Sequence, residues 1–450
     1  MKMVYSVEDK PKFGQMIVFA FQQLLAILAA TIAVPMIIGN GMSVAAALFG
    51  AGIGTLVYVL FTKAKSPVFL GSSFAFLGSM GAAFAGAVSA QAGFAGLIIG
   101  AALAGLVYVV IALIVKFAGV NWLNKLMPAV VIGPTVAIIG LSLAGNAIGD
   151  LQKGDVEGGS VYVALICGLV TFFVVTLCST YGKKMAKLIP FIIGIIAGYV
   201  VAVIFTVVGI ATDNTALMII NFDPIKALWA DGVTFGTFIS VPEFSFVTAL
   251  KGVKEIDGAY IGTVAAAYIP VAFVVFAEHV ADHKNISSII ERDLLEKPGL
   301  HRTLLGDGVG SMVGAFFGGC PNTTYGESVA CVAITRNASV ITIICTAIMA
   351  IVVSFIAPVI AFLDSIPACV MGGVCMSLYG FIAVSGLKML QPVDLNKNNN
   401  LFVASVILIA GIGGLSLTFG KVTITTIACA LILGIITNII LSRKNEETEE

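Results

Sequence analysis

Long hydrophobic runs, separated by short polar or charged segments, dominate the chain from residue 13 onward. Each run approaches the roughly 20 apolar residues that an α-helix needs to cross a bilayer. The first runs predict helices at 15–38, 43–61, 76–90, 94–115, 127–147, 160–180 and 187–210. A second set predicts helices at 262–282, 302–318, 328–336, 338–361, 367–387, 400–416 and 421–442. We therefore predict an all-α polytopic membrane protein with about 14 transmembrane segments.

The longest stretch without such a run is 211–257, which contains Pro224, Pro242 and mixed charge. We interpret it as an extracellular linker with an amphipathic helix near 245–255. It separates a first repeat, 1–210, from a second repeat, 258–442, which is followed by a short acidic tail at 443–450. Because an odd number of helices per half turns the halves over, we predict two inverted seven-helix repeats.

Lys and Arg are concentrated in every second loop. Lys63 with Lys65 and Lys183 with Lys187 lie in such loops, whereas the segment 150–157 between them is balanced by acids. Basic residues accumulate in the cytoplasmic loops of membrane proteins. The alternation therefore predicts an even number of crossings with both termini in the cytoplasm.

Each half contains a break rich in Gly, Pro and Ser or Thr after its second helix. The breaks are KSPVFLGSSFAFLG (65–78) and GGCPNTTYGESVA (318–330). Interrupted segments at corresponding positions of two halves indicate a transporter site built from broken helices. Backbone groups at the breaks need partners, and pairing the two segments as short strands would provide some. The half-helices that follow would then present N–H donors to carbonyl oxygens or anions.

Charged residues are scarce in this chain. They make up 11% of the residues against 59% hydrophobic, and the mean hydropathy is +1.07. Near the end of the predicted helix 262–282 and at the second break, however, lie Glu278, Asp282 and Glu327. Ionisable residues in a membrane segment are candidates for function because charge is costly there. The net charge of zero leaves no basic surface for nucleic acid.

Glu278 and Asp282 are four residues apart and therefore share one helix face. Burial disfavours an ionised carboxylate and two nearby charges repel, so at least one of the pair is expected to hold a proton. A protonated Glu278 could carry a coupling proton, and an ionised one could accept N–H groups of a neutral heterocycle. The alternative is a helix-end Glu278 facing the cytoplasm. His279 is expected to point elsewhere, and His283 to mark the cytoplasmic end of the helix.

No sequence pattern indicates a cofactor, a metal or an enzyme. The eight Cys residues show no CxxC and no Cys/His spacing suited to zinc, so we interpret them as small core residues. The segment GDGVGS (306–311) imitates part of a phosphate-binding loop without the preceding strand. We expect no cofactor and no metal, and without a nucleophile and base we do not expect an enzyme.

The segment AEHVADHKNISSIIERDLLEKPGLHRTLLGDGVGSMVGAFFGGCPNTTYGESVACVAITR closely resembles the signature region of the nucleobase–ascorbate transporter family of nucleobase:cation symporters, in its uracil permease branch. FQQLLAILAATIAVP (21–35), SPVFLGSSFAF (66–76) and IPACVMGGVCMSLYG (366–380) extend the resemblance over essentially the whole chain. The resemblance implies a core domain and a gate domain formed by two inverted repeats. It also implies proton-coupled uptake of uracil by alternating access across the cell membrane, with H⁺ as the coupling ion, and suggests a homodimer.

The resemblance also assigns roles to individual residues. Glu278 corresponds to the main base-binding acid and Glu327 to a second one. The positions that match backbone contacts or walls of the site are Phe74, Gly326, Ala30 and Tyr325.

Proton coupling is assigned in the same way to Glu278, Glu327, Asp282 and Tyr379. Asp282 stands where some family members have His, so its part in the proton path is open. Cys375 stands where related permeases can have Ser.

Several alternatives remain open from the sequence. Xanthine, uric acid or thymine would suit the same polar groups as uracil, and Na⁺ could replace H⁺. Sulfate and bicarbonate carriers share the implied fold, but they often have a regulatory domain and a cation near the site, which this chain lacks. An ion channel is a further alternative, although broken helices with titratable acids favour alternating access.

Overall fold

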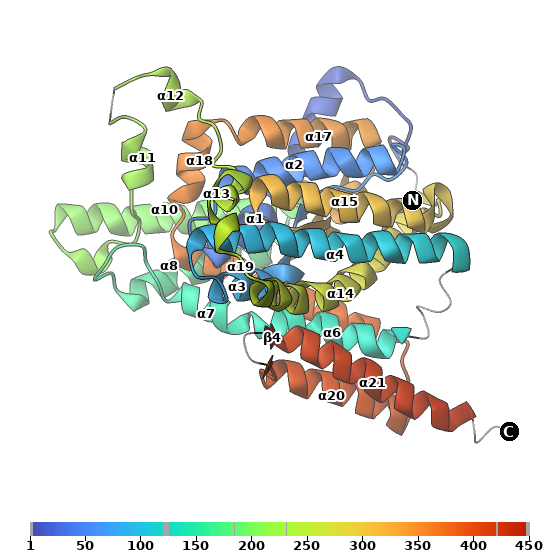
Figure 1. The fold of residues 1–450 in the computed structure, drawn as a ribbon. Coiled ribbons are helices and arrows are strands. Elements are labelled where there is room, and N and C mark those ends of the chain that lie inside the picture. The colour runs from blue at the N-terminus through green and yellow to red at the C-terminus, as the bar shows by residue number, and fades with distance from the viewer. Residues whose placement is uncertain (1–2, 120–125, 184, 231, 420–421, 447–450) are drawn as a thin grey trace.

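The hydrophobic runs form helices throughout the structure, a computed structural model that describes residues 3–119, 126–183, 185–230, 232–419 and 422–446 (Figure 1). The first half contains α1 (Phe13–Ile38), α2 (Val44–Phe61), α3 (Leu77–Ala85), α4 (Ala90–Ala118), α6 (Ala129–Ser142), α7 (Ala144–Leu151), α8 (Val161–Tyr181), α9 (Met185–Leu188) and α10 (Pro190–Ala211). The second half contains α14 (Gly258–Ile290), α15 (Leu300–Gly318), α16 (Gly326–Thr335), α17 (Val340–Val353), α18 (Ala357–Asp364), α19 (Ala368–Met389), α20 (Asn398–Ile412) and α21 (Thr426–Glu446).

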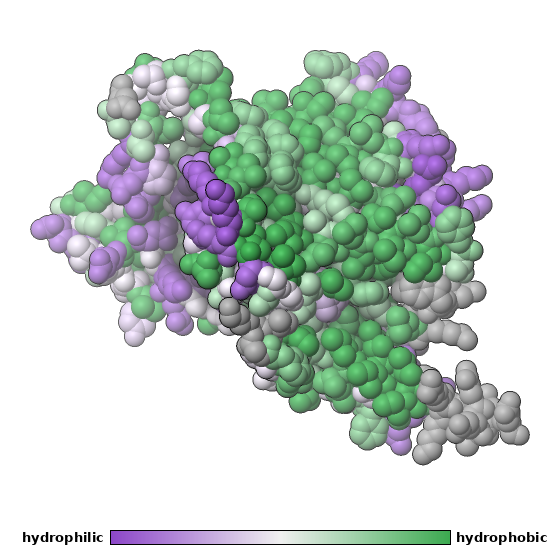
Figure 2. Space-filling view, viewed as in Figure 1, coloured by the Kyte–Doolittle hydropathy of each residue, from purple (hydrophilic) through white to green (hydrophobic). Residues whose placement is uncertain are grey.

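Within the described residues, eight helices are long and apolar enough to cross a membrane. They are α1, α2, α4, the pair α6–α7, α8, α10, α14 and α19. Shorter apolar helices include α16, α17, α20 and α21. Figure 2 shows a face over α4 and α15 that is almost entirely hydrophobic, with hydrophilic residues toward its left and right edges. Exposed Leu106, Val110 and Phe117 of α4 belong to such a lipid-facing surface. The chain is a multi-pass membrane protein.

Several helices differ from the sequence-based boundaries. The predicted helix 338–361 is two helices, because Pro358 lacks an N–H and cannot continue α17 beyond Val353. The predicted helix 127–147 is likewise divided into α6 and α7. In contrast, α14 continues to Ile290 and does not end near Asp282, where the apolar run ends. The acidic tail is helical as far as Glu446, and residues 447–450 lie outside the described part.

The segment between the halves is not plain coil. It contains α11 (Asp223–Ala227), α12 (Phe235–Phe238) and α13 (Ser245–Gly252). The last of these, followed by a 3₁₀ turn at Val253–Glu255, coincides with the expected amphipathic helix. A small hairpin of β3 (Leu417–Phe419) and β4 (Val422–Ile424) precedes α21 and has no counterpart in the prediction.

Two short strands meet inside the helical body. β1 (Leu70–Ser72) and β2 (Asn322–Thr324) pair antiparallel, with Gly71 opposite Thr323. Hydrogen bonds from Ser73 N to Pro321 O and from Tyr325 N to Phe69 O extend the pair at both ends. These strands occupy the two breaks identified in the sequence, and their pairing satisfies backbone groups that hydrocarbon would leave unpaired. Because the pair is antiparallel, the chain leaves it toward α3 and toward α16 at opposite ends.

Close packing of α2 against α15 fixes the position of β2. A Cβ on Gly54 would lie 2.7 Å from the backbone oxygen of Gly310, and one on Gly50 would lie 2.5 Å from that of Gly314. Such contacts require glycine on both helices, as is common where membrane helices approach closely. Asn322 of β2 lies in this crossing and donates a 3.0 Å hydrogen bond from Nδ2 to the carbonyl of Gly50.

Candidate functional site

A cavity of about 440 Å³ opens beside the β1–β2 pair. It is lined by side chains from α14, by the segment from β2 into α16, and by the turn Phe74–Phe76 that precedes α3. Its opposite wall comes from α6, α9, α10 and α19, with Val136, Ile139, Lys187, Phe191 and Phe381 among the lining residues. The cavity therefore lies between elements of both halves of the chain.

Five of the six residues predicted to bind substrate line this cavity: Phe74, Glu278, Tyr325, Gly326 and Glu327. The sixth, Ala30 of α1, is 1% exposed and does not line it, whereas Ala26, one turn earlier on α1, does.

Helix α14 contributes two carboxylates to the same cavity. Glu278 and Asp282 are both half-buried and both line it, as their spacing of one helical turn requires. Asp282 also accepts a 2.8 Å hydrogen bond at Oδ2 from Oγ1 of Thr324, at the end of β2. This bond fixes the α14 face relative to the paired strands.

Glu327 lines the cavity from the first turn of α16. The backbone N–H groups of this turn lack helical partners and carry the positive end of the helix dipole. Gly326 is exposed to the cavity, and a Cβ placed on it would meet only Oδ1 of Asp282, at 4.0 Å. The absence of a side chain at this position leaves the N-terminus of α16 accessible to a ligand.

Hydrogen bonds behind the cavity hold the start of α16 in place. Ser328 accepts at Oγ from Gln23 Nε2 of α1 at 2.5 Å and from the backbone N–H of Phe69 at 3.0 Å. The hydroxyl of Tyr325 donates to the carbonyl of Ser72 at 2.8 Å. Its ring fills the space above Gly71, where a Cβ would lie 2.3 Å from the ring carbons. The turn that carries Glu327 is thus tied to α1 and β1.

Tyr379 of α19, predicted to take part in proton coupling, lies next to this site without lining the cavity. It is 2% exposed, and its ring packs edge-on against Phe74 with 6.0 Å between centroids. Its described contact with the site is therefore made through an aromatic side chain.

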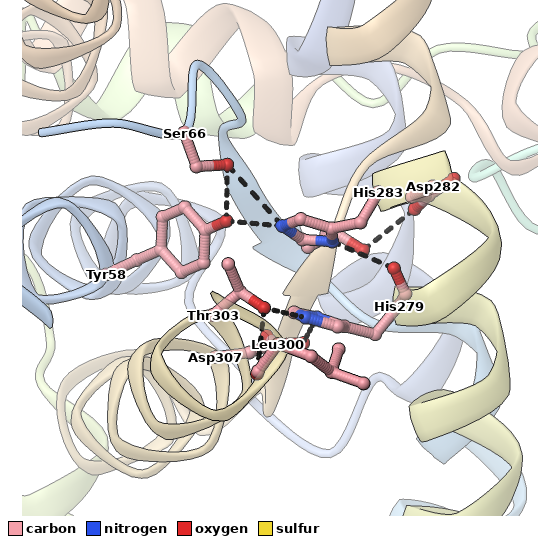
Figure 3. A network of polar contacts seen from close by, with 9 residues as sticks. Tyr58, Ser66, His279, Asp282, His283, Leu300, Thr303 and Asp307 are labelled. Carbon is pink, nitrogen blue, oxygen red and sulfur yellow. Dashed lines mark hydrogen bonds and ion pairs between the residues drawn. The ribbon is translucent and has the colours of Figure 1, made fainter. Parts of the chain in front are cut away.

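The structure also contains a buried polar cluster that the sequence interpretation did not identify (Figure 3). His279 Nδ1 lies 2.7 Å from Asp307 Oδ2, and its Nε2 lies 2.9 Å from Thr303 Oγ1, both on α15. His283 is 0% exposed, with Nε2 2.7 Å from the Tyr58 hydroxyl of α2. The prediction that His283 marks the end of the helix was wrong, because α14 continues past it and packs this face against α2.

A sequence signal existed for part of the missed set. Asp307 is an acid within an apolar helix, which is the property that identifies Glu278 as a candidate. Lys187 of α9 lines the cavity from the opposite wall and is the only basic residue among its described lining residues. In the sequence, Lys187 belongs to a cluster of basic residues expected in a cytoplasmic loop, so nothing indicated that it lines the cavity.

The arrangement suits a small, planar, polar molecule. Carboxylates on α14 and α16 can accept N–H groups, and the N-terminus of α16 can donate to carbonyl oxygens. Phe74 and Tyr325 supply aromatic surface beside them. Among the described residues, no group of three or more His, Cys, Asp or Glu side chains is arranged to hold a metal ion.

The chain resembles known solved structures in fold. It matches the transmembrane domain of a cyanobacterium bicarbonate transporter BicA with a TM-score of 0.63 and 16% identity, covering 96% of this chain and 100% of that one. It matches the murine Slc26a9 anion transporter in the inward-facing state with a TM-score of 0.66 and 11% identity, covering 97% of this chain and 69% of that one. Because the sequence identities are this low, the structural similarity shows a shared fold and nothing about the substrate.

Sequence relatives are much more similar. The chain is 38% identical to the uracil permease of Bacillus caldolyticus, over 100% of this chain and 97% of that protein. It is 38% identical to the uracil permease of Bacillus subtilis and 34% identical to that of Escherichia coli, covering 99% and 95% of this chain and 97% and 92% of those proteins. A family model described as the Permease family matches residues 14–420. The chain therefore belongs to this permease family, the nucleobase–ascorbate transporters, and is a transporter and not an enzyme.

Proposed function

We propose that the protein imports uracil across the cell membrane by proton symport with alternating access. The observation that carries the proposal is the combination of two kinds of group in one cavity. The carboxylates of Glu278 and Asp282 line it, and the open N-terminus of α16 at Gly326 lies beside them, with a Cβ on Gly326 placed 4.0 Å from Asp282 Oδ1. Relatives named uracil permeases, 34–38% identical over nearly the full length, support uracil as the substrate.

The polar edge of uracil suits these groups. Uracil has two N–H donors and two carbonyl acceptors on a flat ring. Glu278 accepts an N–H, with Glu327 as a second acceptor, and the backbone N–H groups at Gly326 and Phe74 donate to the carbonyls. Phe74 and Tyr325 then contact the ring, and Ala30 supports the wall from behind.

Proton coupling follows from three acids at one cavity. Glu278, Asp282 and Glu327 all line it, and three ionised carboxylates at such spacing would repel one another. We propose that one of them takes up the symported proton when uracil binds and releases it with uracil inside the cell. Tyr379 acts on this set through its contact with Phe74.

The proposed movement rests on the arrangement of the elements. Fourteen segments in two inverted repeats would form a core domain, which carries β1, β2, α14 and α16, and a gate domain, which includes α6, α10 and α19. The cavity lies between these two groups of helices. Movement of one group past the other would expose it to each side of the cell (inner) membrane in turn, with both termini in the cytoplasm. A homodimer is part of this proposal.

Transport of an anion is the second candidate, because both structural neighbours are named as anion or bicarbonate transporters. The lining of the cavity argues against it. Three acidic side chains face the space, against Lys187 as the only base among the described lining residues. An anion would be repelled by this balance unless all three acids were protonated.

Uptake of radiolabelled uracil by cells that express the protein tests the proposal. We expect uptake that collapses with a protonophore, persists when Na⁺ is replaced by choline, and is reduced most strongly by unlabelled uracil among uracil, xanthine, uric acid and thymine. Uptake that requires Na⁺, or that xanthine reduces more strongly than uracil, would contradict the coupling ion or the substrate respectively.

A further inference from the structure

Two histidines of α14 lie beside the carboxylates but face away from the cavity. His279 and His283 each follow an acid by one position, which places them about 100° around the helix from Glu278 and Asp282. Both are 0% exposed, and their rings stack 4.0 Å apart with an angle of 26° between the planes. The helix thus has a carboxylate face toward the cavity and an imidazole face toward α2 and α15.

The protonation of His283 can be read from its partners. Nδ1 lies 2.8 Å from the carbonyl oxygen of His279, which can only accept, so Nδ1 carries a proton. In a neutral imidazole, Nε2 is then an acceptor, and the Tyr58 hydroxyl lies 2.7 Å from it. Ser66 Oγ is 2.7 Å from the same hydroxyl and 3.4 Å from Nε2 (Figure 3). His283 is thereby joined to α2 and to the segment before β1.

His279 joins the same face to α15. Its two ring nitrogens contact Asp307 at 2.7 Å and Thr303 at 2.9 Å. The imidazole face therefore makes polar contacts with three separate elements, and all the residues that provide them are buried. Hydrogen bonds require particular distances and angles, so they fix the rotation of α14 about its axis. Apolar contacts tolerate sliding and do not fix it.

Ser66 is connected to the cavity by the chain segment that follows it. Ser66 is three residues before Phe69, whose carbonyl accepts from Tyr325 N and whose N–H donates to Ser328 Oγ. The segment that contacts His283 thus also holds the turn that carries Glu327. A change at the cluster would therefore affect α14 and the turn that carries Glu327 together.

We propose that Tyr58, Ser66 and His283 are positioning residues, which set the rotation of α14 and so direct Glu278 and Asp282 into the cavity. This inference rests on the proposed function for its substrate. The three residues touch no substrate themselves. Their loss reduces affinity by turning the carboxylates away from the ligand.

The test compares two Tyr→Phe variants of the full chain. Tyr58→Phe removes only the hydroxyl that His283 contacts. Tyr108→Phe is the matched control: Tyr108 is also buried, its ring lies edge-on to His279 at 6.4 Å, and its hydroxyl has no hydrogen-bond partner among the described residues. We expect Tyr58→Phe to raise the Kd for uracil about tenfold, the effect of losing one hydrogen bond to a positioned group, while Tyr108→Phe binds as the unmodified protein does.

A second readout does not depend on uracil. Ala281 lies between the two acids on α14 and lines the cavity. In a Cys331→Ala background, which removes the native thiol of the cavity lining, an Ala281→Cys side chain is expected to react with a hydrophilic maleimide more slowly once Tyr58→Phe is added. If the unmodified protein does not bind uracil, the proposed substrate fails and the labelling rates still test the positioning.

Folding effects are separated by a third variant. The Tyr58→Phe/Ser66→Ala/His283→Leu triple variant removes all three partners and leaves none of their polar side-chain atoms unpaired, so it restores thermal stability without restoring affinity. Restored affinity in the triple variant would overturn the proposal, as would a Tyr58→Phe protein whose Kd and labelling rate equal those of Tyr108→Phe.

Discussion

Thr324 donates a 2.8 Å hydrogen bond from Oγ1 to Oδ2 of Asp282. The bond connects the end of β2 with α14, and therefore connects the turn that carries Glu327 with the helix that carries Glu278. This hydrogen bond holds α14 next to the turn that carries Glu327. The hydroxyl also satisfies a carboxylate that would otherwise face the cavity with fewer donors.

Replacing Thr324 with Val tests this contact. Val keeps the shape of Thr and removes only the hydroxyl. Hydrogen bonds to charged groups contribute about 1.5–3 kcal/mol, so we expect uracil affinity to fall by roughly tenfold to a hundredfold. Isothermal titration of the purified protein measures this. Thr176→Val is the control, because among the described residues the Thr176 hydroxyl bonds only to the carbonyl of Phe172 in its own helix. Equal affinities for the two variants would show that the Asp282 contact is irrelevant to binding.

Gly326 offers a test of access to the end of α16. An added methyl group would meet nothing closer than 4.0 Å in the protein and would project into the cavity. We expect Gly326→Ala to fold with unchanged thermal stability but to bind uracil at least tenfold more weakly, because the methyl occupies the place of the ligand. Tight binding by this variant would place the ligand elsewhere.

The glycine crossing of α2 and α15 predicts an effect on stability. In Gly54→Ala the new Cβ would lie 2.7 Å from the backbone oxygen of Gly310 and 2.4 Å from the Asn322 amide. Overpacking of this kind costs about 1–3 kcal/mol. Thermal unfolding in detergent should show a lowered midpoint, whereas Gly14→Ala, with nothing within 4 Å of its Cβ, should leave it unchanged or raise it. A midpoint for Gly54→Ala equal to that of Gly14→Ala would contradict the described packing.

Much of the architecture was predictable because the physics is local. An apolar run in lipid must form a helix, and a Gly- and Pro-rich break such as 65–78 must find backbone partners. Local rules also identified Glu278 and Glu327, since a carboxylate in an apolar run is rare. The division at Pro358 was missed because the prediction followed hydropathy, and the apolar run continues through a proline that is itself a local signal for a helix break.

The imidazole cluster could not be predicted in this way. His283 and Tyr58 are 225 positions apart, and neither carries a local sign of the other. Which face of α14 meets α2 depends on the packing of several helices. The sequence also could not show which residue of α1 lines the cavity. Ala26, one turn before Ala30, lines it, and Ala30 does not.

The central claim is that Glu278 both binds the base and takes part in proton coupling. Glu278→Gln keeps the size of the side chain and removes the titratable group. Glu327→Gln is expected to weaken binding severely, while Glu296→Gln, a change at an exposed position after α14, should behave as the unmodified protein.

Uptake of radiolabelled uracil by the Glu278→Gln variant, measured across external pH at matched expression, tests this claim most directly. We predict no uptake above background at any pH, alongside normal uptake by Glu296→Gln. Uptake by Glu278→Gln with the normal rate and normal pH dependence would contradict the account.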